Sequence, residues 1–358
     1  MDAARKASKD KGNCKSVEEF WKDPEPKIKA LSESLRTKAY KTSPYHHRTI
    51  WERKERVLSI LPFYPDNICD HAIINVIGGL LLSVLPKNTH ACIKGRGISG
   101  CMKAVDTTME KARKWSDVCA LKMDIHHYFQ SVNHDKLKVL VRKKIKDADL
   151  LWLLDEIIDS IDGIPIGRFL SQYLSNYNLA WFDHYVLEVV IPTLFPNGRC
   201  DYERYMDDIV LIGDDKAKLH QAREMIETYL RDELSLSIKP NWQVFRIAEN
   251  RNDKRGRGLD FIGFVWYQNQ KLLRKQIKKN FAKKCGELRY VTKGQISSWI
   301  GWCKYSDSKH LFQSLTNCNY YDFTQRHKTR RFREGGQRRD ALSLRHRGGD
   351  NSSNDRRR

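Results

Sequence analysis

Two apolar runs with acidic residues at one end constrain the fold of this chain more than any other feature. The run Ile209–Ile212 directly follows Asp207 and Asp208, and "DVCALKMDI" (117–125) carries Asp124 near its end. Short apolar runs bounded by turn residues are typical of strands buried in a sheet. Adjacent carboxylates at such a strand end repel each other and lose solvation. They indicate either a solvated acidic turn or a site for divalent cations.

The segments between these runs decide how the two strand ends meet. Residues 203–215 predict strand, tight turn and strand, and a basic helix (134–146), a turn (163–167) and a long helix (169–189) precede them. A strand followed by helices and a hairpin can bring the strand ends together in one sheet. Three converging carboxylates would then bind two divalent cations, as in-line phosphoryl transfer requires. Asp214 and Asp215 fit an ordinary turn better.

The rest of the chain predicts an α+β protein. Residues 1 to about 15 are expected to form a flexible basic leader. The other expected elements are helix in 16–45, strands in 45–60 around the charged turn "ERKER", helices near 66–85, 100–114 and 216–234, a β segment at 258–267 and mostly helix in 271–322.

Charge points to a polyanionic partner. The net charge of the chain is +21, and such a surplus most often accompanies nucleic-acid binding. Residues 324–358 contain 12 basic and 4 acidic residues, a net of +8. This basic tail is expected to be disordered by itself, and either ordering on RNA or DNA or a purely solubilising role would explain it.

Cysteine and apolar patterns bear on the compartment. None of the nine cysteines forms a CxxC pair, and such scattered cysteines suit reduced thiols in a cytosolic protein. The N-terminus has no apolar signal core, and the longest apolar stretch, Ala72–Leu85, is too short to cross a bilayer. We therefore expect a cytoplasmic protein without a membrane partner.

Four motifs in order give the chain a family resemblance. "YMDD" (205–208) resembles the metal-binding signature of reverse transcriptases, and "MDIHHYFQSV" resembles the first metal motif of that family. "RKERVLSILPF" resembles its fingers strands, and "GLDFIGF" (258–264) its primer grip. The resemblance spans about residues 40–320 and implies a right-hand polymerase with fingers, an antiparallel palm sheet with helices, and a helical thumb. The implied parts are an N-terminal leader and helix (1–45), fingers (46–115), palm (116–257), primer grip and thumb (258–323) and the basic tail (324–358).

The resemblance also assigns the metal site. Asp124, Asp207 and Asp208 would be catalytic and, with the backbone carbonyl of Ile125, would hold two Mg²⁺ ions, with Mn²⁺ as an alternative in vitro. Lys239 in "LSIKPNW" is the nearest candidate for a general acid that protonates pyrophosphate, although its spacing does not match well.

Further positions would contact nucleotide or primer. Phe129 would exclude a 2′-hydroxyl, and Lys54 and Arg56 would pair with the triphosphate. The structural alternative for Phe129 is an aromatic residue of the core, and for Lys54 and Arg56 it is a solvated charged turn. The remaining implied nucleotide-binding residues are Ile166, Gly167 and Gln172, and the implied primer-grip residues are Phe261, Gly263 and Phe264, for which a strand core is an equal explanation.

One departure from the common pattern indicates a branch of the family. Most reverse transcriptases carry "QGxxxSP", whereas this chain has "IGRFLSQ", with Ile166 in place of Gln and Gln172 in place of Pro. This resembles the reverse transcriptases of diversity-generating retroelements, which are found in bacteria, archaea and phages. That branch copies a template-repeat RNA into adenine-mutagenised cDNA and works with a small, basic, helical accessory protein oligomer. The expected partners are therefore an RNA template, a DNA or RNA primer, deoxynucleoside triphosphates and such a protein.

Other functions remain open at this point. A group II intron-like or other bacterial reverse transcriptase of ordinary fidelity shares the motifs, but a group II intron-like enzyme is expected to carry additional domains after the thumb. A viral RNA polymerase would favour Gly before the Asp pair, and a retroviral enzyme would need a ribonuclease H domain. The alternative of another class is a catalytically idle RNA-binding scaffold, for which clustered carboxylates would bring no benefit.

Overall fold

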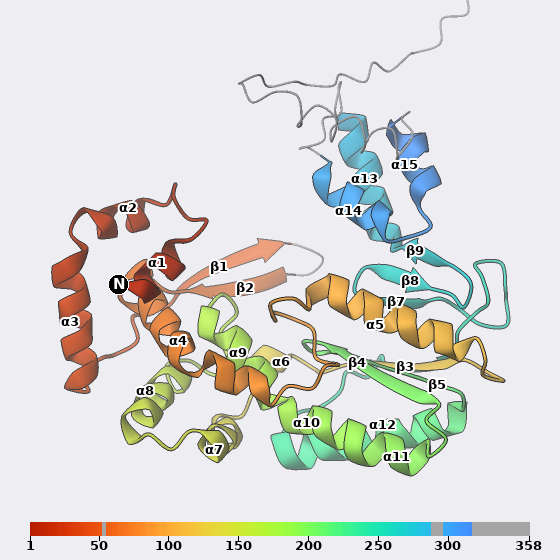
Figure 1. Cartoon of the computed structure of the whole chain (residues 1–358), viewed down its shortest axis with the longest axis horizontal. Helices are drawn as coiled ribbons and strands as arrows, with labels where there is room; N and C mark the ends of the chain where they lie inside the picture. Colours follow the sequence, from red (N-terminus) through yellow and green to blue (C-terminus); the bar gives the residue numbers. More distant parts are fainter. Residues whose placement is uncertain (52–54, 288–295, 317–358) are drawn as a thin grey trace, which may run out of the picture. The chain divides into compact units, whose positions relative to one another are not determined.

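A four-stranded antiparallel sheet organises the first of the two units into which the chain divides, Met1–Arg246 and Ile247–Arg358. The computed structural model describes residues 1–51, 55–287 and 296–316. The strands of this sheet, in the order β4-β5-β3-β6, are β4 (Cys200–Tyr205), β5 (Asp208–Gly213), β3 (Cys119–Asp124) and β6 (Gln243–Arg246) (Figure 1). Both apolar runs are therefore strands of one sheet, and the predicted hairpin is confirmed.

Burial explains why β5 has an unbroken apolar run. Its residues from Ile209 to Gly213 are all buried. Helix α12 (Lys216–Leu234) packs against β3, β5 and β6, and α5 (Gly97–Ala112) packs against β4. Figure 1 shows α12 on one side of the sheet and α5 on the other. A strand covered on both faces has no solvent side, so polar alternation disappears.

The helices between β3 and β4 depart from the sequence prediction at 148–158, where no helix was predicted, and within the helix predicted for 169–189. They are α6 (Tyr128–Ser131), α7 (His134–Lys144), α8 (Ala148–Ile158), α9 (Phe169–Asn178), α10 (Ala180–Tyr185), the wider turn η2 (Val186–Val190) and α11 (Ile191–Leu194). The single helix predicted for 169–189 is interrupted at Leu179, where the chain forms a tight turn with Leu179 N donating to Asn176 O at 3.2 Å. Asparagine is unfavourable in helix interiors because its amide competes for backbone partners, and the Asn176 amide donates both to Gln172 O, one turn earlier, and to Ala91 O.

The expectation of a flexible leader at the N-terminus was wrong for residues 2–8. These residues form α1 (Asp2–Ser8), which packs against α4 (Ile68–Ser83) with Ala4 and Ala7 fully buried. The small side chains of Ala4 and Ala7 allow α1 to pack closely against α4, although most other residues of α1 are polar. The helices α2 (Lys15–Lys22) and α3 (Pro24–Arg36) follow, and Pro24 occupies the first turn of α3, where its missing N–H is not needed.

The expected fingers strands form a hairpin of β1 (His46–Trp51) and β2 (Glu55–Ile60). Residues 52–54 of its charged turn lie outside the described residues. The short segment η1 (Phe63–Asn67) leads from β2 into α4. These elements confirm the strands predicted for 45–60 and the helix predicted near 66–85.

The second unit contains a small sheet and helices. The sheet has the order β7-β8-β9, with β7 (Leu259–Phe261), β8 (Phe264–Trp266) and β9 (Lys271–Leu273). The β segment predicted at 258–267 is thus a hairpin, turned at Ile262 and Gly263, which both have positive φ. The helices are α13 (Lys275–Glu287), α14 (Ser297–Lys304) and α15 (Lys309–Thr316). The basic tail, 324–358, lies outside the described residues.

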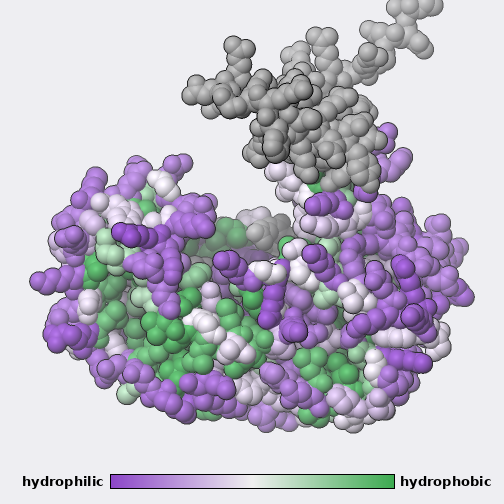
Figure 2. Space-filling model, in the orientation of Figure 1, coloured by the Kyte–Doolittle hydropathy of each residue, from purple (hydrophilic) through white to green (hydrophobic). Residues whose placement is uncertain are grey.

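The surface matches the charged composition. Figure 2 shows a largely hydrophilic face, with apolar side chains reaching the surface around α4, where Val76 is 77% exposed. In the part of the chain that the structure describes, no helix combines the length and apolar character needed to cross a membrane.

Candidate active site

The three aspartates predicted to act together lie at one end of the four-stranded sheet. Asp124, the last residue of β3, is the direct cross-strand partner of Asp208, the first residue of β5. Asp207 precedes Asp208 in the turn, and its backbone O accepts a hydrogen bond from Ile125 N at 3.2 Å. The register of two strands therefore brings together residues that are more than 80 positions apart in the sequence.

The turn that carries Asp207 has an unusual backbone. Tyr205 and Asp208 are cross-strand partners, so Met206 and Asp207 form a two-residue hairpin turn. Met206 has a φ of 59°, a conformation that glycine adopts readily and that other residues adopt at a cost. Such conformations persist only where surrounding contacts hold them, and they concentrate at functional sites.

The electrostatics of the site centre on Asp207. Burial raises the pKa of its carboxyl group to about 6, and the charges of Asp124 and Asp208 act in the same direction. Lys239 lies at the same place: its Nζ contacts Asp124 Oδ1, and its backbone N donates to Asp124 O at 2.8 Å. Lys239 therefore lies beside the acidic cluster, although its spacing in the sequence did not match the family pattern well.

The three carboxylates are chemically suited to bind divalent cations. Hard cations prefer carboxylate oxygens, and a cation would offset the burial and the neighbouring charges that together raise the pKa of Asp207. Within residues 1–51, 55–287 and 296–316, no group of three or more His, Cys, Asp or Glu side chains is already arranged to hold a metal ion. Because the Lys239 ammonium contacts Asp124 Oδ1, a metal ion would compete with that ammonium for this oxygen.

Phe129 is joined to the "GIPIG" turn by backbone contacts. The residue is half-buried in α6, and its carbonyl accepts a hydrogen bond from Ile164 N at 2.6 Å. Gly163 has a φ of 67°, and a Cβ there would lie 2.3 Å from the Phe129 carbonyl oxygen. Only glycine allows this approach, so the turn and Phe129 form one local unit.

The same turn continues to β2. Ile166 is partly exposed, and its carbonyl accepts from Ser59 N at 2.8 Å. A Cβ on Gly167, whose φ is 113°, would lie 3.3 Å from Ser59 O. The side chain of Ile166 is therefore only partly covered by its surroundings. Backbone contacts tie residues 163–167 both to Phe129 and to the β1–β2 hairpin.

The other predicted nucleotide-binding residues are placed differently. Arg56 is exposed on β2, opposite Ile50, and Gln172 is exposed on α9. Lys54 lies outside the described residues. In the second unit, Phe261 and Phe264 are both buried, and the Phe264 ring lies 4.9 Å from that of Trp302. Their rings belong to the core of that unit, and Gly263 between them is also buried, whereas Ile262 in the same turn is partly exposed.

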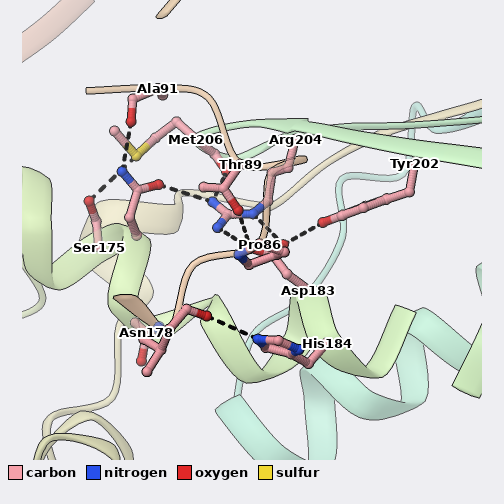
Figure 3. Close-up of polar contacts among 12 residues, drawn as sticks. Pro86, Thr89, Ala91, Ser175, Asn178, Asp183, His184, Tyr202, Arg204 and Met206 are labelled. Atoms are coloured by element: carbon pink, nitrogen blue, oxygen red, sulfur yellow. Dashed lines mark hydrogen bonds and ion pairs between the residues drawn. The ribbon is translucent and has the colours of Figure 1, made fainter. Parts of the chain in front are cut away.

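Sequence reasoning missed a buried polar network beneath the acidic turn. Arg204 and Asp183 are both fully buried and form a double hydrogen bond (Figure 3). A charged residue inside the alternating strand "CDYERY" and a second one inside an apolar helix are the sequence signals that could have suggested it.

The comparison with protein families gives the chain its class. The family model described as reverse transcriptase (RNA-dependent DNA polymerase) matches residues 52–264. The match covers more than half of the chain and includes all three aspartates, so this protein belongs to the reverse transcriptase family.

Individual relatives are distant. The protein YkfC of Escherichia coli (strain K12) is 24% identical over 268 residues, which are 65% of this chain and 65% of YkfC. Telomerase from Candida albicans, solved with a TWJ fragment of telomeric RNA, matches with a TM-score of 0.53 and 10% identity over 84% of this chain and 58% of that chain. The corresponding complex from Candida tropicalis gives a TM-score of 0.53 and 10% identity over 86% and 59%. At these identities the structures show a shared reverse transcriptase fold, and this chain spans less than two thirds of the length of each relative.

Proposed function

We propose that this protein is an RNA-directed DNA polymerase whose acidic cluster binds two divalent cations. The register between β3 and β5 carries the proposal, because it sets Asp124 opposite Asp208 beside Asp207, with all three residues only partly exposed. A binding scaffold for anionic RNA would gain nothing from gathering carboxylates in one place. Bound cations would supply charge neutralisation for the triphosphate and a lowered pKa for the attacking hydroxyl.

Individual residues would bind the cations, donate a proton and contact the incoming nucleotide. Asp124, Asp207, Asp208 and the carbonyl of Ile125 would hold the cations. Lys239, released from Asp124, would be near enough to the cluster to protonate the leaving pyrophosphate. Phe129 would lie under the incoming sugar, and Arg56, with Lys54, would pair with the triphosphate.

Substitution of Asp207 tests the proposal. Asp207→Asn removes one charge at nearly constant volume and should abolish primer extension on an RNA template with Mg²⁺. The matched control is Asp214→Asn, the same change next to the opposite end of β5, where Asp214 pairs with Arg199 at 3.5 Å. Extension by Asp207→Asn at more than a few per cent of the parent rate would overturn the metal assignment. A parent protein that never extends a primer would favour the RNA-binding scaffold.

We further propose that the enzyme belongs to the mutagenic retroelement branch. The partly exposed Ile166 supports this, because its side chain offers no hydrogen bond where most relatives carry Gln, and its backbone is fixed to β2. Loss of a polar contact that checks base-pair geometry costs far more discrimination than a change in apolar fit. In this branch the template would be a template-repeat RNA and a small basic accessory protein would take part. The alternative is a reverse transcriptase of ordinary fidelity.

The comparison of Ile166→Gln with the parent tests the branch. One added hydrogen bond is worth about 1 kcal/mol, roughly a fivefold effect, and correct pairs should gain more from it than mismatches. We expect misincorporation opposite template adenine to fall when both enzymes extend one primer on the same RNA and the cDNA is sequenced. Equal error spectra would remove Ile166 from the argument. A parent that copies adenine as faithfully as the other bases would favour ordinary fidelity.

A further inference from the structure

The side chain of Arg204 is held in one position from several sides. Its Nε and Nη2 donate to the two carboxylate oxygens of Asp183, each at 2.6 Å. Asp183 also accepts from Tyr202 OH at 2.6 Å and from Thr89 Oγ1 at 2.7 Å. Neither Arg204 nor Asp183 has any exposed surface. The guanidinium is therefore held directly by a charged partner, which also accepts hydrogen bonds from two hydroxyl groups (Figure 3).

The remaining nitrogen of Arg204 reaches the catalytic turn. Its Nη1 donates to Met206 O at 2.8 Å, in the backbone of the hairpin turn. That carbonyl belongs to the peptide bond between Met206 and Asp207. Because a peptide unit is planar, holding its oxygen fixes the orientation of the whole unit. The contact thus limits the direction in which the Cα–Cβ bond of Asp207 can point.

Further contacts hold the same turn from α9. Ser175 Oγ donates to the sulfur of Met206 at 3.4 Å, and Arg204 Nη1 also donates to Asn176 Oδ1 at 3.3 Å. Met206 keeps a left-handed backbone without being glycine, which requires such support. Met206, which directly precedes the aspartate pair, is thus contacted by Ser175 and Arg204, and Asn176 holds the Arg204 nitrogen that reaches it.

We propose that Arg204 is a positioning residue, which holds the Met206 carbonyl so that the Asp207 carboxylate is aimed at the metal site, while Asp183 neutralises its charge. A buried ion pair is seldom more stable than well-packed apolar residues of the same volume. The Arg204–Asp183 ion pair is therefore explained better by the orientation of the Met206 carbonyl than by a gain in stability. The inference rests on the proposed polymerase function, since it concerns the aim of a catalytic carboxylate.

Two variants separate positioning from stability. Arg204→Met/Asp183→Asn removes both charges together, so no uncompensated charge is left buried, and the carbonyl oxygen of the new amide can still accept from Tyr202. Arg204→Lys keeps a positive charge for Asp183 but lacks the guanidinium fork that reaches both Asp183 and the Met206 carbonyl. The matched controls are Tyr202→Phe and Thr89→Val, each of which removes one hydroxyl group from Asp183 and leaves the Arg204–Met206 contact in place.

The measurements are kcat, the Kd for template–primer, and Mn²⁺ binding followed by electron paramagnetic resonance. A displacement of about 1 Å at a reacting group costs about 100-fold, so both Arg204 variants should lose roughly 10- to 100-fold in kcat and bind Mn²⁺ more weakly. Their Kd for template–primer should stay within about twofold, and both controls should keep kcat near that of the parent.

The outcomes distinguish the inference from the function on which it rests. Folded Arg204 variants that keep the parent kcat and Mn²⁺ affinity would overturn the positioning role, even in an active polymerase. Controls that lose as much kcat as the Arg204 variants would assign the network to stability instead. If the double variant does not fold, Arg204→Lys decides by the same criteria. A parent that binds Mn²⁺ through these residues but extends no primer would refute the proposed function and leave the Mn²⁺ comparison as the test of positioning.

Discussion

Gly163→Ala should disturb the site through a backbone contact rather than through a lost side chain. Gly163 has a φ of 67°, and an alanine Cβ would lie 2.3 Å from the Phe129 carbonyl oxygen and 2.8 Å from the backbone of Gln130. Both neighbours are backbone atoms, so they cannot move aside as a flexible side chain would. The segment that carries Phe129 has to shift, or Gly163 has to leave its conformation.

The magnitude has two parts. A left-handed conformation costs a residue with a Cβ about 1 kcal/mol, and overpacking of this kind costs about 1–3 kcal/mol. Together they destabilise the first unit by about 2–4 kcal/mol. Gly198→Ala supplies the control, because Gly198 has a φ of 70° and a Cβ there would meet no atom within 4 Å. It should cost about 1 kcal/mol, so the difference between the two variants isolates the steric part.

Urea unfolding followed by tryptophan fluorescence measures that difference. With a slope of about 3 kcal/mol per molar urea, an additional 2 kcal/mol lowers the midpoint by about 0.7 M. Primer extension should reveal the local effect as reduced discrimination between deoxynucleotides and ribonucleotides, since Phe129 moves with its backbone. Equal midpoints for Gly163→Ala and Gly198→Ala, with unchanged sugar discrimination, would refute the reasoning.

Three further predictions concern other parts of the chain. Phe129→Val should open space for a 2′-hydroxyl and raise ribonucleotide incorporation relative to deoxynucleotide; unchanged selectivity in an active variant would make Phe129 a core residue. Asp215 accepts from Ala217 N at 2.8 Å and Lys218 N at 3.1 Å at the start of α12, so Asp215→Ala should cost about 1 kcal/mol in urea unfolding without changing kcat, and no loss of stability would contradict the capping role. Deletion of residues 324–358 should weaken RNA binding and flatten its salt dependence because fewer counterions are released; an unaltered salt slope would leave the tail without an RNA contact.

The secondary-structure elements predicted best are those whose sequence of apolar and polar residues directly reflects which faces are buried. An apolar run bounded by aspartates predicted β5 because both faces of that strand are covered. The meeting of Asp124 with Asp208 followed from the order of elements. Lys239 was uncertain from spacing alone, since its approach depends on the backbone contact between Lys239 N and Asp124 O.

The features that the sequence did not predict depend on partners distant in the chain. Periodicity treats a charged residue as exposed, so it cannot indicate that Arg204 is buried until Asp183 is known to lie against it. The amide of Asn176, three residues before the interruption at Leu179, likewise reaches a partner distant in the chain, Ala91 O. Ala4 and Ala7 of α1 are buried because α1 packs against α4, which begins more than 60 residues after them in the chain.

The pairing at the outer side of β4 has a consequence for how the protein behaves at high concentration. β4 stands at the edge of the four-stranded sheet, and exposed edges recruit strands from other molecules. Here Arg204 N donates to Asn88 O at 2.9 Å and His90 N donates to Arg204 O at 3.1 Å, so residues 88–90 pair with the edge of β4 at Arg204, close to the turn that carries Asp207. The same loop that supplies Thr89 to Asp183 therefore covers this part of the edge, and we expect a shortened loop to leave the Arg204 backbone open to pairing with a strand of another molecule.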